Sequence, residues 1–343
     1  MSQLDFDTVA LRLWLTQNVP ALNDAEGDMQ LTRISGGQSN PTFFVDFGGQ
    51  ELVLRKQPVG VLLPSAHAVD REFKVLHALS TTDVPVPQVL AYCADRSVIG
   101  TPFYVMQRLH GRVLPTLAMP ELPAAQRGAH VLAMAETLAR LHAVDVHTVG
   151  LGDYGRPGNY FERQVARWSR QWLNTDRPRD AAFVQAISSV TRWLNEHIPS
   201  SQTCTIAHGD YRLGNLMFHA TEPRVIGVLD WELSTLGHPL ADVAYCAMAW
   251  QMQAGDFDGV RGLDLAAQGL PTMNEFVAHY QRSGGCTEPL LPFHLVFSMY
   301  RIAVILDGVA ARGEAGNAAS ADAGRVGGQA VAYAQRALEV MNG

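Results

Sequence analysis

The chain has 343 residues, of which 47% are hydrophobic and 17% are charged, and its formal net charge is −7. This length predicts two domains or two lobes with a sizeable core. The composition excludes a disordered tail protein, a collagen-like repeat and a disulfide-stapled miniprotein. The acidic balance argues against nucleic acid as a partner, because there is no broad basic surface. Only Lys56 and Lys74 are lysines, so any mechanism that requires lysine has two candidates.

The cysteines and the apolar segments indicate the compartment. The four cysteines are widely spaced and form no CxxC pair, which favours a reducing environment over disulfides or a zinc site. The N-terminal segment lacks the basic and apolar regions of a signal peptide. The apolar stretch 295–306 is interrupted by Arg301 and is too short to cross a bilayer. We therefore expect a soluble cytoplasmic protein with no membrane partner, and its oligomeric state stays open.

The first part of the chain, residues 1–107, is expected to be β-rich. Period-2 alternation predicts strands, and Gly48-Gly49 is typical of a tight hairpin turn. Helical spacing of apolar residues predicts one helix before the sheet and one inserted in it. The expected elements are a helix at 6–18, strands at 31–34, 42–47 and 51–56, a helix at 70–79, and strands at 88–92 and 102–106.

The rest of the chain, residues 108–343, is expected to be mostly helical with a short β-rich segment at 203–229. The expected helices are 124–142, 160–173, 181–197, 242–253, 273–283, 292–311 and 329–341. The Ala- and Gly-rich segment 313–328 is expected to be a loop. A small antiparallel β-rich lobe followed by a large helical lobe is an α+β arrangement, not an alternating βαβ array.

The segment His208-Gly-Asp-Tyr-Arg-Leu-Gly-Asn215 carries the strongest chemical signal. An Asp followed five residues later by an Asn, after His-Gly, fits a catalytic loop in which Asp210 accepts a hydroxyl proton and Asn215 turns toward a metal ion. Fifteen residues further on, Asp230 follows an apolar strand in the run VLDWE, a suitable place for a hard oxygen ligand of Mg²⁺. The alternative, that these are ordinary turn and cap residues, is made improbable by the paired spacing.

Two weaker signals lie upstream. The turn from Ile34 to Asn40 is rich in Gly and hydroxyl side chains, so its backbone N–H groups could approach phosphate oxygens, although a simple hairpin turn would look similar. Glu72 lies on the helix after the third strand, where it could pair with a basic residue of that strand or simply be solvated.

Along the chain, the motifs are a Gly-rich turn, a basic residue on the third strand, a helix glutamate, HGDxxxxN and DWE. This order resembles the aminoglycoside phosphotransferase and choline-kinase-like branch of the protein-kinase fold. Four segments extend the resemblance to the kinase-like domain attached to acyl-CoA dehydrogenase family members ten and eleven: GGQSNPTF, LVLRKQP, DREFKVLHAL and IGTPFYVMQRLHGR. The resemblance covers residues 30–250, roughly. It implies a bilobal protein-kinase-like fold and ATP-dependent phosphorylation of a hydroxyl group on a small-molecule acceptor, with Mg²⁺.

The resemblance also assigns roles to residues. Asp210 matches the family's catalytic Asp, and Asn215 and Asp230 match its metal ligands. Asp242 and His208 match residues that brace the catalytic loop. The resemblance assigns the turn that covers the phosphates to Gly36, Gly37, Gln38, Ser39 and Asn40. The strand cation is Arg55 or Lys56, and the helix glutamate is Glu72. Met106 would lie at the back of the adenine pocket, and Gln107 and Leu109 would form the hinge.

One position departs from the family pattern. Arg55 occupies the place of the phosphate-binding lysine, and Lys56 is the next residue, which strand alternation sends to the opposite face. The planar fork of Arg55 could pair with both the phosphate oxygens and Glu72. A one-residue bulge would present Lys56 instead, and both possibilities stay open.

The segment 150–199 lies where this family places contacts to the acceptor. Its first helix carries aromatic and arginine residues: Tyr160, Phe161, Arg163, Arg167, Trp168, Arg170 and Trp172. This face could bind a phosphorylated or CoA-bearing acceptor. The alternative, which the pattern favours, is an amphipathic helix with a Trp-anchored core face and solvated arginines. The subfamily resemblance suggests a hydroxyacyl-CoA acceptor, whereas the broader family includes aminoglycosides, choline and homoserine.

Two other function classes were weighed. A catalytically weak, nucleotide-binding pseudokinase is favoured by Arg55 and disfavoured by the joint presence of Asp210, Asn215 and Asp230. An oxidoreductase is suggested by GLGDYG at 150–155 and by the dehydrogenases to which the related domain is fused. That glycine pattern follows no strand, however, and no stretch resembles a flavin-binding part.

Overall fold

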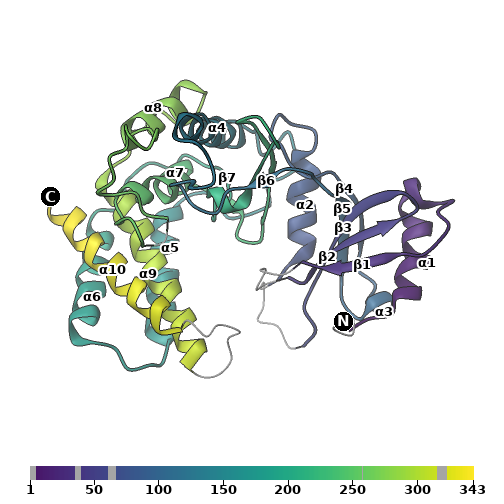
Figure 1. Ribbon diagram of the computed structural model, residues 1–343. Coiled ribbons are helices and arrows are strands. Elements are labelled where there is room, and N and C mark those ends of the chain that lie inside the picture. The colour runs from purple at the N-terminus through teal and green to yellow at the C-terminus, as the bar shows by residue number, and fades with distance from the viewer. Residues whose placement is uncertain (1–4, 35–39, 61–66, 257, 315–322) are drawn as a thin grey trace. The chain divides into compact units, whose positions relative to one another are not determined.

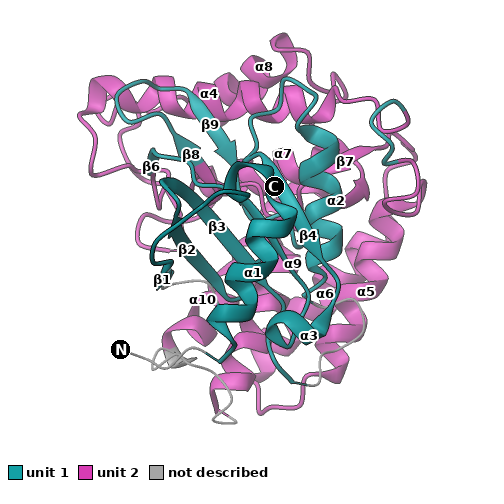
Figure 2. Ribbon diagram, turned by 90° about the vertical axis from the view of Figure 1, so that its right-hand side faces the viewer, with its two compact units in different colours: residues 1–112, 148–151, 217–234 teal, residues 113–147, 152–216, 235–343 magenta. Residues whose placement is uncertain are grey.

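The computed structural model of the chain describes residues 5–34, 40–60, 67–256, 258–314 and 323–343 (Figure 1). The chain packs into two compact units (Figure 2). Unit 1 comprises residues 1–112, 148–151 and 217–234, and unit 2 comprises residues 113–147, 152–216 and 235–343. The chain thus returns to unit 1 twice, and the lobe boundary expected after residue 107 stays a prediction.

Unit 1 is built on a five-stranded antiparallel sheet in the order β1-β2-β3-β5-β4. Its strands are β1 (Gln30–Arg33), β2 (Thr42–Phe47), β3 (Gln50–Lys56), β4 (Val89–Cys93) and β5 (Phe103–Gln107), each within two residues of its predicted bounds. Gly48 and Gly49 join β2 to β3 with φ of 57° and 73°, the left-handed values that a two-residue hairpin turn of this kind requires.

The two faces of this sheet have different partners. One face packs an apolar cluster against α1 (Thr8–Asn18), whose Leu11 and Leu15 are fully buried. Asp7 caps that helix by accepting hydrogen bonds from the second and third helical N–H groups. The helix α2 (Val69–Leu79) packs against β4 and β5, and α3 (Arg96–Ile99) packs against α1. Because successive side chains of a strand alternate, neighbouring residues of β3 face different surroundings.

Residues 217–234 bring a further strand into unit 1. The strand β9 (Val225–Val228) pairs with β8 (Leu216–Phe218) in a small sheet of order β6-β8-β9, in which β6 is Arg112–Val113. The N–H of Val228 donates to the carbonyl of Pro85 at 2.8 Å, which ties the end of β9 to unit 1. Asp230 follows two residues after this strand.

Unit 2 is mainly helical. Its helices are α4 (Ala124–His142), α5 (Tyr160–Asn174), α6 (Ala181–Glu196), α7 (Pro239–Ala247), α8 (Met273–Arg282), α9 (Pro292–Glu314) and α10 (Ala323–Asn342). The helix α9 packs against α5, α6, α7 and α10 around one apolar core. The strands β7 (Thr205–Ala207) and β10 (Thr235–Gly237) pair antiparallel, and the catalytic-loop motif begins directly after β7. The antiparallel sheet with a mostly helical second part is the predicted α+β fold.

Two predictions about the helical part were wrong. The helix α9, expected at 292–311, has 23 residues, and by length and composition it could cross a membrane, although the apolar stretch 295–306 within it was expected to be too short. Of its apolar window, 83% is buried within the protein, as in a core helix. The segment expected as a loop at 313–328 is helical at both ends, since α9 continues to Glu314 and α10 begins at Ala323. These helical ends contain four glycines and one alanine, so helix propensity does not explain them, and the packing of α10 against α9 and α6 outweighs it.

Candidate active site

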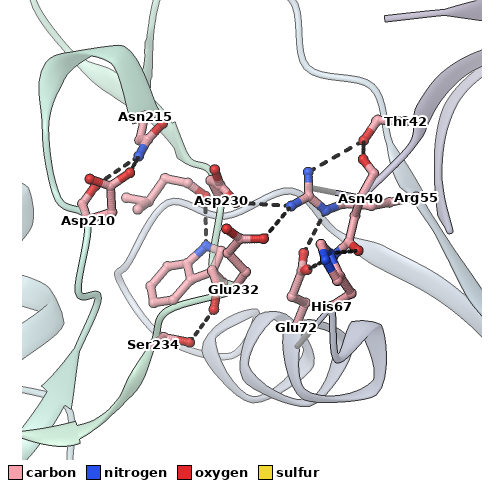
Figure 3. Close-up of polar contacts among 12 residues, drawn as sticks. Asn40, Thr42, Arg55, His67, Glu72, Asp210, Asn215, Asp230, Glu232 and Ser234 are labelled. Carbon is pink, nitrogen blue, oxygen red and sulfur yellow. Dashed lines mark hydrogen bonds and ion pairs between the residues drawn. The ribbon is translucent and has the colours of Figure 1, made fainter. Parts of the chain in front are cut away.

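Arg55 is the centre of the polar site in unit 1 (Figure 3). Its Nε lies 2.7 Å from Glu72 Oε2, and its Nη2 lies 3.0 Å from Asp230 Oδ1 and 4.0 Å from Glu232 Oε2. Burial alone would lower the pKa of Arg55, but the surrounding carboxylates raise it above its usual value. The guanidinium therefore stays charged and links α2 to the segment after β9.

Glu72 is the partner of the strand cation, as the helix position of this residue predicted. It is 1% exposed, and it also accepts hydrogen bonds from Asn40 Nδ2 at 2.6 Å and from the hydroxyl of Tyr104 at 3.1 Å. Burial raises the pKa of Glu72, while Arg55 and the two hydrogen-bond donors oppose that rise. Asn40, which sequence analysis placed in the phosphate-covering turn, thus also fixes the carboxylate that orients Arg55.

Lys56 points to the other face of β3. Its side chain is completely buried, its Nζ lies 2.9 Å from Asp5 Oδ2, and the ammonium lies 5.0 Å from the ring centroid of Phe6. The register of β3 against β5, with Arg55 opposite Tyr104 and Lys56 opposite Phe103, is continuous and contains no bulge. In unit 1, therefore, Arg55 and not Lys56 faces Glu72.

Asp230 adopts a backbone conformation that few residues tolerate. Its φ of 63° is left-handed, which is uncommon outside glycine but accessible to Asp and Asn. Its carboxylate is 38% exposed, with one oxygen held by Arg55. The indole N–H of the next residue, Trp231, donates to the carbonyl of Val228 at 2.9 Å and anchors the turn. The turn presents a half-open carboxylate at the end of a buried strand.

The residues assigned to the nucleotide base lie on or just after β5. Met106 is half-buried on this strand, opposite Val53 of β3. The N–H of Gln107 donates to the carbonyl of Gln88 at 2.8 Å, so this N–H is already engaged and not open to a base. Leu109 packs over Gly227, where any side chain would collide with it. Gly36, Gly37, Gln38 and Ser39 lie outside the described residues.

Asp210 is the centre of the polar site in unit 2. Its Oδ2 accepts a hydrogen bond from Asn215 Nδ2 at 2.7 Å, and its Oδ1 accepts one from the hydroxyl of Tyr245 at 2.5 Å (Figure 3 shows the Asn215 contact). Arg212 Nε lies 3.8 Å from Oδ2. The side chain of Asp210 is 26% exposed, so a carboxylate with both oxygens oriented still reaches solvent.

The loop that carries Asp210 is held in place by hydrogen bonds to Asp242. The buried carboxylate of Asp242 accepts hydrogen bonds from the N–H groups of His208 at 2.6 Å and Gly209 at 2.9 Å. Burial opposes ionisation, but His142 and these N–H groups lower the pKa of Asp242 below its usual value. Gly209 has a φ of 83°, which lets the chain turn sharply before Asp210. His208 accepts a hydrogen bond from the N–H of Asp210 through Nδ1.

The donor atoms present suit Mg²⁺. Both side-chain hydrogen bonds of Asn215 use Nδ2, to the carbonyl and the carboxylate of Asp210, which leaves Oδ1 as a hard oxygen donor. In unit 1, Asp230 by itself offers carboxylate oxygens. Mg²⁺ commonly takes one or two protein oxygens together with water and phosphate oxygens. The described part of the chain holds no cluster of three or more His, Cys, Asp or Glu side chains suited to a metal.

Two residues of the unit 2 site escaped sequence analysis. Tyr245 lies three residues after Asp242 on α7, hence on the same side of that helix. Arg301, on α9, donates a hydrogen bond from Nη2 to the carbonyl of Gly209. The sequence does contain a signal for Arg301, since a single arginine interrupts an otherwise apolar stretch.

The glycine pattern at 150–155 is not a nucleotide-binding turn. It lies in the turns between α4 and α5 with no strand before it. The helix α5 itself buries Phe161, Val165, Trp168 and Trp172 at helical spacing, as the amphipathic interpretation predicted.

A family model described as the phosphotransferase enzyme family (APH) matches residues 30–276. Acyl-CoA dehydrogenase family member 10 of Mus musculus is 41% identical over 309 residues, which are 88% of this chain and 28% of that protein. The chain spans between 28% and 43% of the length of such curated relatives.

Two solved structures show the same fold. A protein of Ralstonia eutropha JMP134, provisionally assigned as an aminoglycoside phosphotransferase, is 42% identical, with a TM-score of 0.87 and 98% of each chain covered. A thermostable mutant of aminoglycoside phosphotransferase APH(4)-Ia, in a ternary complex with AMP-PNP and hygromycin B, is 18% identical, with a TM-score of 0.62 and 96% of this chain and 99% of that chain covered.

Proposed function

The chain belongs to the phosphotransferase enzyme family, and from this membership we propose that it transfers the γ-phosphoryl group of ATP to a hydroxyl group of a small-molecule acceptor. The observation that carries the proposal is the environment of Asp210. Two side-chain donors, from Asn215 and Tyr245, hold its two carboxylate oxygens while the group stays accessible to solvent. This is the arrangement that a positioned general base requires.

Each residue then has a defined task. Asp210 orients the acceptor hydroxyl and takes its proton as the oxygen attacks the γ-phosphorus. Arg55, held charged by Glu72, provides a planar fork for phosphate oxygens. Asn215 and Asp230 would hold Mg²⁺, which, when bound, offsets the negative charge of the phosphates. The loop brace through Asp242 keeps Asp210 in place without taking part in the proton transfer.

As the acceptor class we propose hydroxyacyl-CoA molecules. The support is the relatives named acyl-CoA dehydrogenases, whose sequences this chain matches at 41% identity in one case. Because the chain corresponds to only part of those proteins, the dehydrogenase activity in their names is not transferred to it. A kinase for a CoA-linked hydroxyl would be a reasonable partner of an enzyme that acts on acyl-CoA.

The test is phosphotransfer from ATP with Mg²⁺ to a panel of hydroxyacyl-CoA molecules, followed as ADP release and as labelled product. The matched variant is Asp210→Asn, which keeps the size and polarity of the side chain but removes the base. We expect the wild-type protein to phosphorylate at least one panel member and the variant to be slower by about 10²- to 10⁴-fold. Equal rates in the two proteins would contradict the role of Asp210.

Two negative outcomes are informative. Absence of ADP release above background with every hydroxyacyl-CoA would remove that acceptor class. Stabilisation by ATP and Mg²⁺ without transfer to hydroxyacyl-CoA, aminoglycoside, choline or homoserine would favour the pseudokinase interpretation.

We also propose a cytoplasmic location. All four cysteines are free, and Cys93 and Cys246 are buried, as expected for a protein in a reducing compartment. Recovery of the protein in a membrane or exported fraction after cell fractionation would contradict this location.

A further inference from the structure

Arg301 is a buried cation without a counter-ion. It is 7% exposed, and it is the one arginine of the described residues that is this deeply buried. No carboxylate in the described ranges lies within ion-pair distance of it, whereas Arg55 and Arg179 each contact buried carboxylates. Its recorded hydrogen bond is from Nη2 to the carbonyl of Gly209, and its Nε is buried without a partner there. A buried charge of this kind is costly unless an opposite charge reaches it.

The neighbours of Arg301 add donors and positive charge. Its guanidinium carbon lies 5.5 Å from the ring centroids of both Trp168 and Tyr245. Arg167 lies 5.1 Å from the ring of Trp168, and burial together with the like charge of Arg301 lowers the pKa of Arg167. The indole N–H of Trp168 is also buried without a hydrogen-bond acceptor among the described residues. Guanidinium and indole groups donate hydrogen bonds and accept none.

One acidic group of this network, Asp242, is already engaged by other partners. Asp242 accepts a hydrogen bond from the N–H of Gly209, and Arg301 donates one to the carbonyl of the same residue. The carboxylate of Asp242 is shared between two loop N–H groups and His142. Asp242 therefore stabilises the loop but leaves the guanidinium of Arg301 without a carboxylate of its own.

The cluster adjoins the general base. Gly209, whose carbonyl accepts from Arg301, directly precedes Asp210 in the chain. Tyr245 contacts Arg301 with its ring and donates from its hydroxyl to Asp210. A group bound at Arg301 would thus belong to a molecule whose hydroxyl can reach Asp210.

We propose that Arg301, supported by Arg167 and the indole N–H of Trp168, binds an oxyanion group of the phosphate acceptor, either a carboxylate or a phosphate. This inference rests on the proposed function, because that function makes the bound molecule an acceptor. The same positive charge disfavours polycationic acceptors. In this proposal Arg167 and Trp168 of α5 contact the acceptor, while the buried face of the helix also packs in the core.

The first experiment measures anion binding without turnover. The full chain is titrated with inorganic phosphate at constant ionic strength, with chloride as the replacement anion and saturating AMP-PNP and Mg²⁺ to occupy the nucleotide site. Melting temperature and calorimetry report the binding. Arg301→Gln is compared with Arg312→Gln, which removes the same charge from an exposed position of the same helix. We expect Arg301→Gln to weaken phosphate binding about tenfold or more and Arg312→Gln to change it less than about twofold.

Two more variants separate binding from a structural role. Arg301→Lys keeps a charge and a donor near Gly209, so it should retain part of the phosphate affinity. Trp168→Phe keeps the ring and removes the N–H, so it should weaken phosphate binding by a smaller factor while leaving AMP-PNP affinity unchanged. Equal phosphate affinity in wild type and in a folded Arg301→Gln variant would overturn the proposal. So would an equal loss in Arg312→Gln.

Competition identifies the source of the oxyanion. Displacement of phosphate by CoA but not by pantetheine assigns the site to a phosphate of a CoA-linked acceptor. Displacement by lactate but not by lactamide assigns it to a carboxylate. Displacement to the same extent by the neutral compounds would contradict an oxyanion site. These measurements need no phosphotransfer. The oxyanion site can therefore be disproved while the kinase assignment stands, and the kinase assignment can be disproved while the oxyanion site stands.

Discussion

Arg55 and Lys56 are adjacent on β3 and point to opposite faces of the sheet. Arg55 contacts Glu72 and Asp230, whereas Lys56 is completely buried against Asp5 and Phe6. Strand alternation alone produces this division. The consequence is that the cation beside the helix carboxylate is an arginine, and that the lysine serves the packing of the N-terminal segment.

The first prediction separates these two roles by substitution. Arg55→Ala should lower kcat/KM for ATP by about 10²-fold or more, because it removes the charged fork that we propose to bind phosphate oxygens. It also leaves Glu72 buried without its partner, which should cost about 3–5 kcal/mol of stability. Arg55→Lys keeps the charge but not the planar fork, so its kcat/KM for ATP and its stability should lie between those of the wild type and of Arg55→Ala. The measurements are steady-state kinetics with varied ATP and urea unfolding.

Lys56→Met is the control for this prediction. Methionine fills the buried volume, and Asp5 is 52% exposed and can be solvated. Stability should therefore change by less than about 1.5 kcal/mol, with kcat/KM for ATP unaltered. A loss of ATP affinity in Lys56→Met as large as in Arg55→Ala would show that the lysine reaches the phosphates.

The second prediction uses the left-handed backbone at Asp230. Asp230→Gly and Asp230→Ala remove the same carboxylate, but only glycine adopts a φ of 63° without strain. Both variants should lose phosphotransfer by about 10²-fold or more, since both lose the carboxylate that we propose to hold Mg²⁺ and its contact to Arg55. Asp230→Gly should be more stable than Asp230→Ala by about 1 kcal/mol in urea unfolding. Activity close to wild type in either variant would exclude Asp230 from the site.

The third prediction concerns Tyr245 as a positioning residue. Tyr245→Phe removes the hydroxyl that donates to Asp210 and keeps the buried ring. We expect kcat to fall about tenfold while KM for ATP is unchanged, because the hydrogen bond orients the base and not the nucleotide. Tyr300→Phe is a matched control, since Tyr300 is equally buried and its hydroxyl bonds Ser169 instead. A tenfold loss of kcat in both variants would indicate a general packing effect.

Local sequence patterns were sufficient for the parts of the site that are contiguous or alternate regularly. The motif around Asp210 lies directly after β7, as its apolar flank predicted, and the hydrogen bonds from Asn215 span five residues. For β3 the sequence left a regular strand and a bulge open, and the structure shows the regular strand, with Arg55 and Lys56 on opposite faces. For Glu72 it left an ion pair and a solvated side chain open, and the structure shows the ion pair with Arg55.

Long-range contacts were beyond sequence reasoning. The hydroxyl of Tyr245 reaches Asp210 across 35 residues, and Arg301 reaches Gly209 across 92. No helical or strand period links such positions, because the contacts depend on how α7 and α9 pack beside the loop. The short elements α3 and β10 were missed for a related reason, since three or four residues carry too little periodicity to detect.

The last prediction concerns the pH dependence of stability. His294 on α9 is 2% exposed, and its pKa is lowered from 6.5 to about 4, mainly by burial and further by His238, with Glu288 opposing. The folded protein therefore holds the neutral ring, while the unfolded chain takes up a proton below pH 6.5. The free energy of unfolding is therefore unaffected by protonation of His294 above pH 6.5. It declines as the pH falls from 6.5 toward 4, by at most about 3 kcal/mol.

His294→Asn should reduce this dependence. The side-chain oxygen of asparagine can replace Nδ1 as acceptor for the N–H of Leu291, and it does not titrate. The variant should lose some stability at pH 7, because the ring packs 5.2 Å from that of Phe161. Between pH 7 and pH 4.5, however, its unfolding free energy should decline by about 2 kcal/mol less than that of the wild type. His197→Asn, at an exposed position, should leave the decline as in the wild type. Urea unfolding at four pH values measures the difference, and parallel curves for wild type and His294→Asn would contradict a neutral buried His294.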